Sequence, residues 1–223
     1  DLSEEELKKD STIKAIFATA MTGLMVDQKK LRDIKEKYGV IIVEDCAHAI
    51  GAKDGPILAG SCSYSDCTIF SFHPVKLITT GEGGAITTNS KTIYKKLIAL
   101  RSHGMIKNES MDPWEYEMRS LGFNYRLTDV QASLGISQLK KLDMFIKKRE
   151  GIAKTYDKAF EKVDIKPLYT FNGKSSYHLY VIQINFDKYS FSKKDLFLDM
   201  KKQNIGLQVH YIPINKQPYY TNL

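Results

Sequence analysis

The chain has 223 residues and a formal net charge of +7, with 43% hydrophobic and 26% charged residues. These values are typical of a soluble globular protein with one large domain, or one domain and a smaller companion. No apolar stretch approaches the roughly 20 residues of a membrane-spanning helix, and no signal peptide opens the chain, so no membrane role is predicted. Three cysteines without metal-type spacing indicate reduced thiols in a cytoplasmic protein without a metal site.

The basic charge raises the alternative of nucleic-acid binding. Only five of the 33 basic residues are arginines, and the lysines come as scattered pairs such as Lys29-Lys30 and Lys140-Lys141. A nucleic-acid face would more typically cluster its basic residues and interleave arginine with aromatic side chains. The sequence therefore favours solvated helix faces, and no nucleic-acid partner is predicted.

The first half of the chain alternates strand and helix patterns. Residues 12–20 have the pattern of a buried strand, and residues 27–38 that of an amphipathic helix ending at Gly39. The continuous apolar run "VIIVED" (40–45) is typical of a fully buried parallel strand. Further strands are predicted at 67–72 and 84–89, and a helix at 91–104. This alternation predicts an α/β sheet with helices packed on its faces.

The second half changes character. Residues 105–127 have no clear period and predict a long irregular loop. Thr128 and Gln131 have capping-box spacing, and the apolar positions that follow predict one long amphipathic helix, or two joined near Gly151. A second unit begins after Lys162. Strands are expected at 176–185 and 205–214, with a helix between them that runs from a Ser192 cap through Gln203.

Three chemically useful side chains follow two of the predicted strands. Asp45 ends one apolar run, and Ser71 and Lys76 follow the next. Ligands of open α/β sheets bind beyond the carboxyl ends of the strands, so the fold can bring these three side chains to one rim. Pyridoxal 5'-phosphate needs a lysine amine for its Schiff base, a carboxylate for its pyridinium nitrogen and hydroxyl or amide donors for its phosphate. The set therefore suits pyridoxal phosphate.

Longer motifs give a specific resemblance. "VEDCAHAIGA", "FSFHPVKLITTGEGGAITTN", "RSHG" and "LGFNYRLTDVQASLGISQLKKL" resemble the DegT/DnrJ/EryC1/StrS sugar-nucleotide aminotransferases, over about residues 13–219. The stretches "SFHPVKLITT" and "HYIPINKQPYY" narrow the resemblance to one branch of that family. The resemblance implies a fold type I α/β enzyme, with a large, mainly parallel-sheet domain and a smaller α/β C-terminal domain. The expected divisions are 1–127, a connecting helix at 128–162, and 163–223.

The resemblance also implies roles for individual residues. Lys76 would bind the cofactor covalently and move the proton, and Asp45 would pair with the pyridinium nitrogen. His48 would lie near the cofactor ring, and Ser71 would bind its phosphate. The remaining roles fall on Asn124, which would reach the phosphate of a neighbouring subunit's cofactor in a homodimer, and on His210 and His178, which would lie near the nucleotide-sugar.

Each of these residues also has an ordinary interpretation. A lone lysine in a basic protein is usually a surface residue, and Asp45 could simply accept hydrogen bonds from loop amides. Ser71 and Asn124 could stabilise turns, and His48 could be a histidine with a satisfied hydrogen bond. The glycines of "GEGG" (81–84) are not a P-loop and instead suit close backbone approach and positive φ. No role for His73 follows from its chemistry.

The predicted function is transfer of an amino group from glutamate to a nucleotide-linked keto-sugar, expected to be a UDP-4-keto-6-deoxy sugar, in cell-surface glycan biosynthesis. A sugar dehydratase of the same fold is disfavoured, because such relatives lack the lysine found here at position 76. The other alternative is a catalytically impaired fragment or assembly partner. Family members have a further N-terminal phosphate loop and a final helix, so the fold is expected to be incomplete at both ends.

Overall fold

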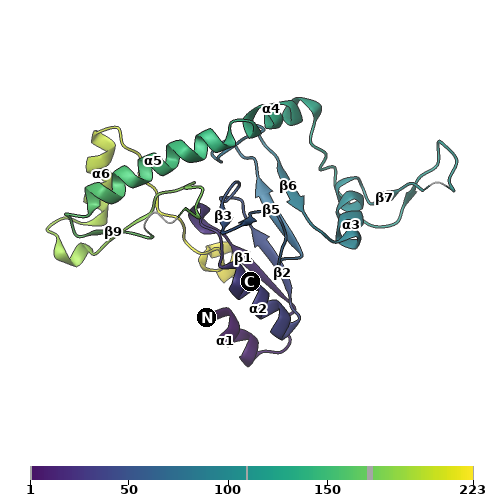
Figure 1. Ribbon diagram of the computed structural model, residues 1–223, viewed down its shortest axis with the longest axis horizontal. Coiled ribbons are helices and arrows are strands. Elements are labelled where there is room, and N and C mark those ends of the chain that lie inside the picture. The colour runs from purple at the N-terminus through teal and green to yellow at the C-terminus, as the bar shows by residue number, and fades with distance from the viewer. Residues whose placement is uncertain (1, 109, 170–172, 223) are drawn as a thin grey trace.

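A four-stranded sheet forms the centre of the computed structural model, which describes residues 2–108, 110–169 and 173–222 (Figure 1). Its strands, in spatial order, are β1 (Ala15–Thr19), β2 (Ile41–Asp45), β5 (Cys67–Ser71) and β6 (Gly84–Thr87). The pairs β1–β2 and β2–β5 are parallel, and β6 is antiparallel to β5. The predicted α/β class with a mainly parallel sheet is confirmed.

The two faces of the sheet have different surroundings. Helices α1 (Leu2–Lys9) and α2 (Gln28–Tyr38) share a core with one face. The members of that core are Leu7, Ala18, Leu31, Ile34, Val40 and Ile42. On the opposite face Phe17 is 69%, Ile41 52% and Ile86 45% exposed. These side chains share that face because strand residues alternate between the two sides of a sheet.

The expectations of a buried strand at 12–20 and of a fully buried strand at 40–45 are therefore wrong, since each strand exposes one face. Ile42 is 0% exposed, whereas its neighbour Ile41 is half exposed. Both α1 and α2 pack with Ile42, so within the described residues only one side of these strands is covered.

Helix α2 ends at Gly39 as predicted, whereas α3 (Lys91–Arg101) ends before the predicted Gly104. Asp27 accepts a hydrogen bond from the backbone N–H of Lys30, and Gly39 ends α2 in the left-handed conformation at φ 64°. Ser90 accepts from the N–H of Ile93 at the start of α3. These local interactions fix where each helix begins and ends.

Two small β-hairpins lie in the segments that connect the main strands and helices. One, made of β3 (Lys53–Asp54) and β4 (Ile57–Leu58), follows β2. The other, made of β7 (Met105–Ile106) and β8 (Glu117–Met118), extends away from the sheet beyond α3 (Figure 1). The predicted loop at 105–127 is thus largely irregular, apart from this hairpin, and position 109 lies outside the described residues.

The predicted long helix is two helices, α4 (Asp129–Leu139) and α5 (Leu142–Phe160), and the Thr128–Gln131 capping box is confirmed. The break falls at residues 140–141 and not near Gly151, which lies inside α5. The two helices have different partners: Gly135 of α4 lies against Thr80, and Leu142 and Ile146 of α5 lie against Gly51. The chain bends between these contacts, and the apolar spacing alone does not reveal that change of partner.

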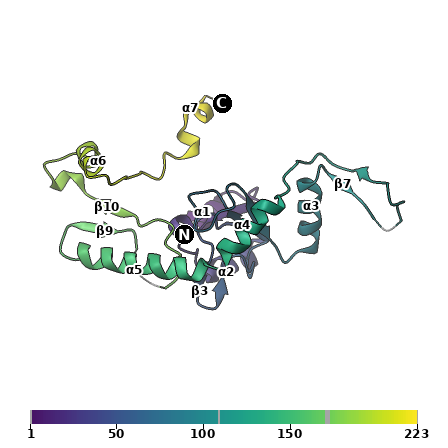
Figure 2. The ribbon, with the colours of Figure 1, turned by 90° about the horizontal axis from the view of Figure 1, so that it is seen from above.

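The C-terminal part contains few strands. Strands β9 (Ile165–Pro167) and β10 (Ile182–Ile184) form an antiparallel pair, and α6 (Lys193–Lys202) begins at its predicted Ser192 cap. Shorter 3-10 helices and a final turn of helix complete the described elements: η1 (Met21–Gly23), η2 (Phe186–Lys188), η3 (Ile214–Lys216) and α7 (Pro218–Thr221). Figure 2 shows the segment from α6 to α7 running apart from α5.

Two strand predictions in this part are corrected. Within 176–185 only Ile182–Ile184 is a strand, because the preceding residues bond to Thr22 and Gly23 instead of a neighbouring strand. Residues 205–213 form no strand, since no described strand pairs with them. The division at 127/128 and 162/163 stays a prediction, and residues 1, 170–172 and 223 of its segments lie outside the described ones.

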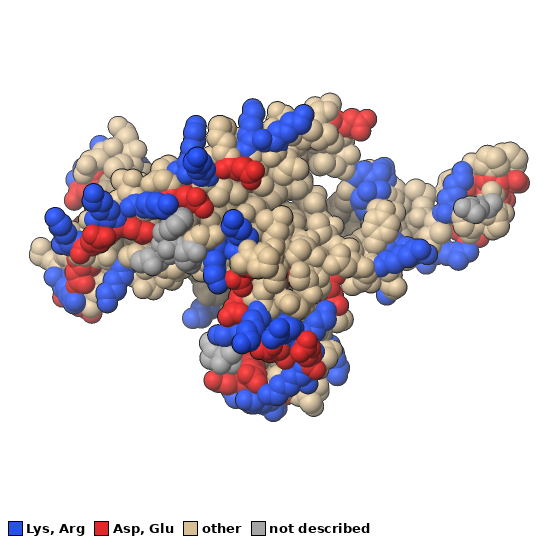
Figure 3. Space-filling view, viewed as in Figure 1, with Lys and Arg blue, Asp and Glu red and all other residues tan. Residues whose placement is uncertain are grey.

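Charged side chains of both signs intermingle on the face shown in Figure 3, as the interpretation of solvated helix faces predicts. Several of the lysines are paired with carboxylates, among them Lys35 with Asp66 and Lys174 with Asp54. Within the described ranges, no helix has the length and apolar character needed to cross a bilayer.

The one-sided core predicts contrasting effects for two adjacent isoleucines. Ile42→Ala should lower the free energy of unfolding by about 2–5 kcal/mol, because it leaves a cavity in the core. Ile41→Ala removes the same atoms from an exposed site and should cost less than about 1 kcal/mol. Urea unfolding of both variants measures the difference, and equal losses would contradict a core on one face.

Candidate active site

The carboxyl ends of the parallel strands bring Asp45 and Ser71 to one rim of the sheet. In the β2–β5 register Asp45 is opposite Ile69, and Ser71 lies two residues further along the same face of β5. Ser71 in turn is opposite Gly84, where β6 begins. The rim is therefore built from three strands, as expected for a ligand site in this class of sheet.

Lys76 lies in a short loop between β5 and β6 that is held at both ends. The amide of Phe72 donates to Gly83 O at 2.8 Å, and that of Thr80 donates to Phe72 O at 3.0 Å. Leu77, which follows the lysine directly, is buried. The loop is thus anchored to the sheet and its core, so Lys76 does not lie on a freely solvated loop.

The environment of Lys76 favours a more reactive amine. Burial lowers the pKa of its ammonium group, and the opposing attraction of Asp45 only partly offsets that effect. A desolvated lysine loses its proton more readily, and the neutral amine is the nucleophilic form. Lys76 also acts electrostatically on His48 and His178, so the loop, the end of β2 and the C-terminal part share one site.

His48 and His178 form a buried ring pair at this site. Each is 9% exposed, and their ring centroids lie 4.3 Å apart at an interplanar angle of 47°. Within the described part of the chain neither Nδ1 has a hydrogen-bond partner. Burial, together with the charge of Lys76, lowers the pKa of His48 to about 4. Burial and the neighbouring His48 lower that of His178 to about 3, so both rings are neutral at pH 7.

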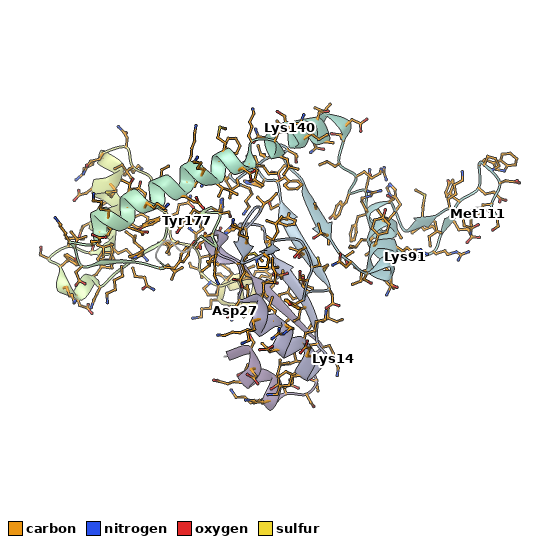
Figure 4. All side chains as sticks on the ribbon, in the orientation of Figure 1. Lys14, Asp27, Lys91, Met111, Lys140 and Tyr177 are labelled. Carbon is orange, nitrogen blue, oxygen red and sulfur yellow. The ribbon has the colours of Figure 1, made fainter. Side chains whose placement is uncertain are left out.

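The other residues predicted for the site lie outside the group formed by Asp45, Lys76, His48 and His178. His210 is half-buried and acts electrostatically on both His48 and His178. Asn124 bridges to Ser102 just after α3, on the far side of β6 from the labelled Tyr177 (Figures 1 and 4). His73 is exposed, with Nε2 3.8 Å from a Glu82 carboxylate oxygen.

The non-catalytic interpretations of these residues agree with only part of what the structure shows. Asp45 does accept a loop amide, that of Ala47 at 3.0 Å, and Ser71 accepts the amide of His73 at 3.4 Å. The unpaired Nδ1 of His48 does not fit a histidine with every hydrogen bond satisfied. The "GEGG" glycines do permit close approach: Gly83 has φ 151°, and a Cβ on Gly84 would lie 2.7 Å from Phe70 O.

Sequence reasoning missed the residues that hold His178 in place. Arg149 on α5 donates through Nη1 to Tyr177 O at 3.0 Å and His178 O at 3.1 Å. Ser176 donates its hydroxyl to His48 O at 3.1 Å. A Cβ on Gly23 would lie 2.9 Å from His178 N, so only glycine fits there without movement. No local pattern marks these residues, because their partners lie 28 or more residues away along the chain.

Comparison with known proteins identifies the family of the chain. The profile of the DegT/DnrJ/EryC1/StrS aminotransferase family matches residues 3–223. A Campylobacter jejuni relative, UDP-4-amino-4,6-dideoxy-N-acetyl-beta-L-altrosamine transaminase, is 41% identical over 227 residues, covering 99% of this chain and 58% of the relative.

Two solved structures extend the comparison. Helicobacter pylori PseC, an aminotransferase involved in the biosynthesis of pseudoaminic acid, is similar with a TM-score of 0.86 and 36% identity, over 94% of this chain and 56% of PseC. The PLP-form of the putative sugar aminotransferase Spr1654 from Streptococcus pneumoniae has a TM-score of 0.82 and 28% identity, over 100% of this chain and 60% of that one. The chain thus spans less than two thirds of the length of these relatives.

The neutral histidine pair predicts a loss of stability in acid. Unfolded histidines titrate near 6.5, whereas the folded pKa values are about 4 and 3, so the unfolded state binds more protons as the pH falls below 6.5. The stability from the pair is present above pH 6.5 and declines down to about pH 4, by up to about 3 kcal/mol for His48. Urea unfolding at pH 7.5, 6.0 and 5.0 measures the decline.

Two variants test the assignment of this decline. His178→Phe keeps the ring volume without a titrating group, so it should remove the share of the decline that His178 contributes and leave the share of His48. His73→Gln, at an exposed site, should leave it unchanged. An undiminished decline in His178→Phe would show that the acid sensitivity arises elsewhere.

Proposed function

Because the chain belongs to the DegT/DnrJ/EryC1/StrS aminotransferase family, we propose that its protein is a pyridoxal-phosphate-dependent sugar-nucleotide aminotransferase. One observation carries the proposal: the partly buried Lys76 amine interacts with the Asp45 carboxylate and with two neutral histidines at the carboxyl end of the sheet. A lysine on the open surface of the protein would lack these neighbours.

The residues at the rim fit pyridoxal phosphate. Lys76 offers an amine whose pKa burial lowers, and Asp45 offers a carboxylate on the same face of the sheet as the Ser71 hydroxyl. When bound, the cofactor supplies an electron sink for the carbon that gains or loses a proton. Asp45 would hold the pyridinium nitrogen protonated, since an adjacent negative charge favours the charged form. Ser71 would bind the phosphate, and His48 would lie against the ring.

Lys76 has two tasks in this proposal. Its neutral amine would hold the cofactor covalently, and the free amine would carry the proton to or from the substrate carbon. Burial suits both tasks, because a lysine with a lowered pKa exchanges its proton nearer to neutral pH. Loop anchoring through Phe72 and Thr80 holds the amine at the rim during these steps.

The names of the relatives support the substrate class. The C. jejuni and H. pylori proteins are named for a UDP-linked amino sugar and for pseudoaminic acid biosynthesis. We therefore propose glutamate as amino donor and a UDP-4-keto-6-deoxy sugar as acceptor, in cell-surface glycan biosynthesis in the cytoplasm. His210 would contact the nucleotide-sugar. Asn124 would serve the cofactor of a second subunit in a homodimer.

The first test is covalent capture of the cofactor. The protein with pyridoxal phosphate should show a visible absorption band that glutamate bleaches, and borohydride should fix the cofactor on Lys76 in peptide mass mapping. Lys76→Ala should lose the band and the adduct and retain less than ~0.1% of the transfer rate. Lys95→Ala, on exposed α3, is the matched control and should behave like the unaltered protein.

Transfer at the full rate by Lys76→Ala would overturn the proposal. Absence of any band in the unaltered protein would instead favour the alternative of a catalytically impaired assembly partner.

A further inference from the structure

The His48–His178 pair lies where two parts of the chain, 130 residues apart in sequence, meet. His48 follows the end of β2, and His178 lies in the segment that leads into β10. Both rings are nine-tenths buried and contact each other, yet neither Nδ1 has a hydrogen-bond partner within the described ranges. Buried polar atoms are normally paired, so two unpaired nitrogens in contacting rings indicate a functional arrangement.

The backbone around the pair is held from both sides. On the His178 side, Arg149 donates to His178 O, and the amide of Leu179 donates to Thr22 O at 3.0 Å. On the His48 side, Ser176 donates its hydroxyl to His48 O. Because the hydrogen bonds fix both backbones, the position of one ring restricts the position of the other.

Two residues at this junction adopt costly conformations. Thr22 has φ 66° and Tyr177, directly before His178, has φ 49°, a left-handed region that non-glycine residues rarely enter. The surrounding hydrogen bonds must impose these conformations, and such strain concentrates at functional sites. Both strained residues belong to the segments that carry or hold His178.

We infer that His178 is a positioning residue, whose ring packs against His48 and fixes the orientation of the His48 imidazole beside the cofactor site. The inference rests on the proposed function, and it gives His178 a role through His48 in place of direct contact with the nucleotide-sugar. The half-buried His210 is better placed for such contact, since a residue that is 9% exposed offers little surface to a substrate.

The surrounding charges are consistent with a neutral pair. Lys76, Arg149 and His210 oppose protonation, and Asp45 alone among the interacting groups favours it for His48. A neutral imidazole keeps one nitrogen as donor and the other as acceptor, so its orientation determines which one a ligand meets. Fixing the ring therefore fixes the hydrogen-bonding character of this side of the site.

The first experiment needs no cofactor. In the protein labelled at histidine, the NMR signal of the His48 ring, assigned by its loss in His48→Gln, should not titrate between pH 8 and 5. In His178→Ala the freed ring should titrate with a midpoint that rises from about 4 toward 6.5. His178→Phe, which refills the space and guards against misfolding of the alanine variant, should keep the ring packed and the midpoint low. His73→Gln, at an exposed site, should leave the His48 signal unchanged.

The second experiment uses the protein loaded with pyridoxal phosphate. His178→Ala and His48→Ala should shift the pH midpoint of the visible band in the same direction, and the double variant should shift it no further than His48→Ala alone. An unchanged His48 signal in His178→Ala, with a raised KM for the nucleotide-sugar, would overturn the inference in favour of substrate contact. A double variant whose shift in the pH midpoint equals the sum of the two single shifts would also overturn the inference.

The two proposals can fail separately. If no variant, nor the unaltered protein, binds pyridoxal phosphate, the proposed function fails, and the cofactor-free NMR titration still decides whether His178 positions His48.

Discussion

Two consecutive carboxylates at the end of β2 point to opposite faces of the sheet, and the rest of the structure depends on this alternation. Glu44 is buried, where it accepts hydrogen bonds from Gln28 Nε2 at 2.6 Å and Ser65 Oγ at 2.7 Å. A buried carboxylate is tolerated only with such partners. They tie the start of α2 and the approach to β5 onto β2. Asp45, one residue on, must then face the other side, where Ser71 lies.

A second junction joins the C-terminal part to this frame. The close approach of Gly23 to His178, together with the hydrogen bond between Ser176 and His48, brings the chain back to the end of β2 after α5. Arg149, whose pKa burial lowers, holds the returning backbone from the helix side. The candidate site is thus shared between residues 45–76 and residues 178–210. The first half of α5 contacts both parts, since Leu142 lies against Gly51 and Arg149 donates to Tyr177 O, which Figure 4 places beside this helix.

Local sequence signals predicted what local interactions determine. The caps at Thr128 and Ser192 lie where the sequence indicates, because each cap bonds to a backbone N–H three residues away. The rim of Asp45, Ser71 and Lys76 was also predictable, since parallel strands end at one edge. Longer motifs were needed to distinguish Lys76 from a surface lysine.

Features that depend on distant partners were not predictable in this way. The bend at residues 140–141 reflects two different surfaces beneath α4 and α5, and residues 205–213 have strand-like composition but no described strand beside them. The same limit applies to Arg149, whose two acceptors are backbone carbonyls that any sequence would supply.

The exposed face of the sheet has a consequence for the chemistry of the site. Phe17, Ile41 and Ile86 lie on the same face as Asp45, and β1 is an edge strand, so the chain as described presents a surface prone to self-association. Anything that covers this face also removes water from around Asp45 and so strengthens the attraction between that carboxylate and a nearby cation. The covering of this one surface therefore controls both the tendency of the chain to associate with itself and the dielectric constant around Asp45. A hydrophobic dye that binds the surface would report on both.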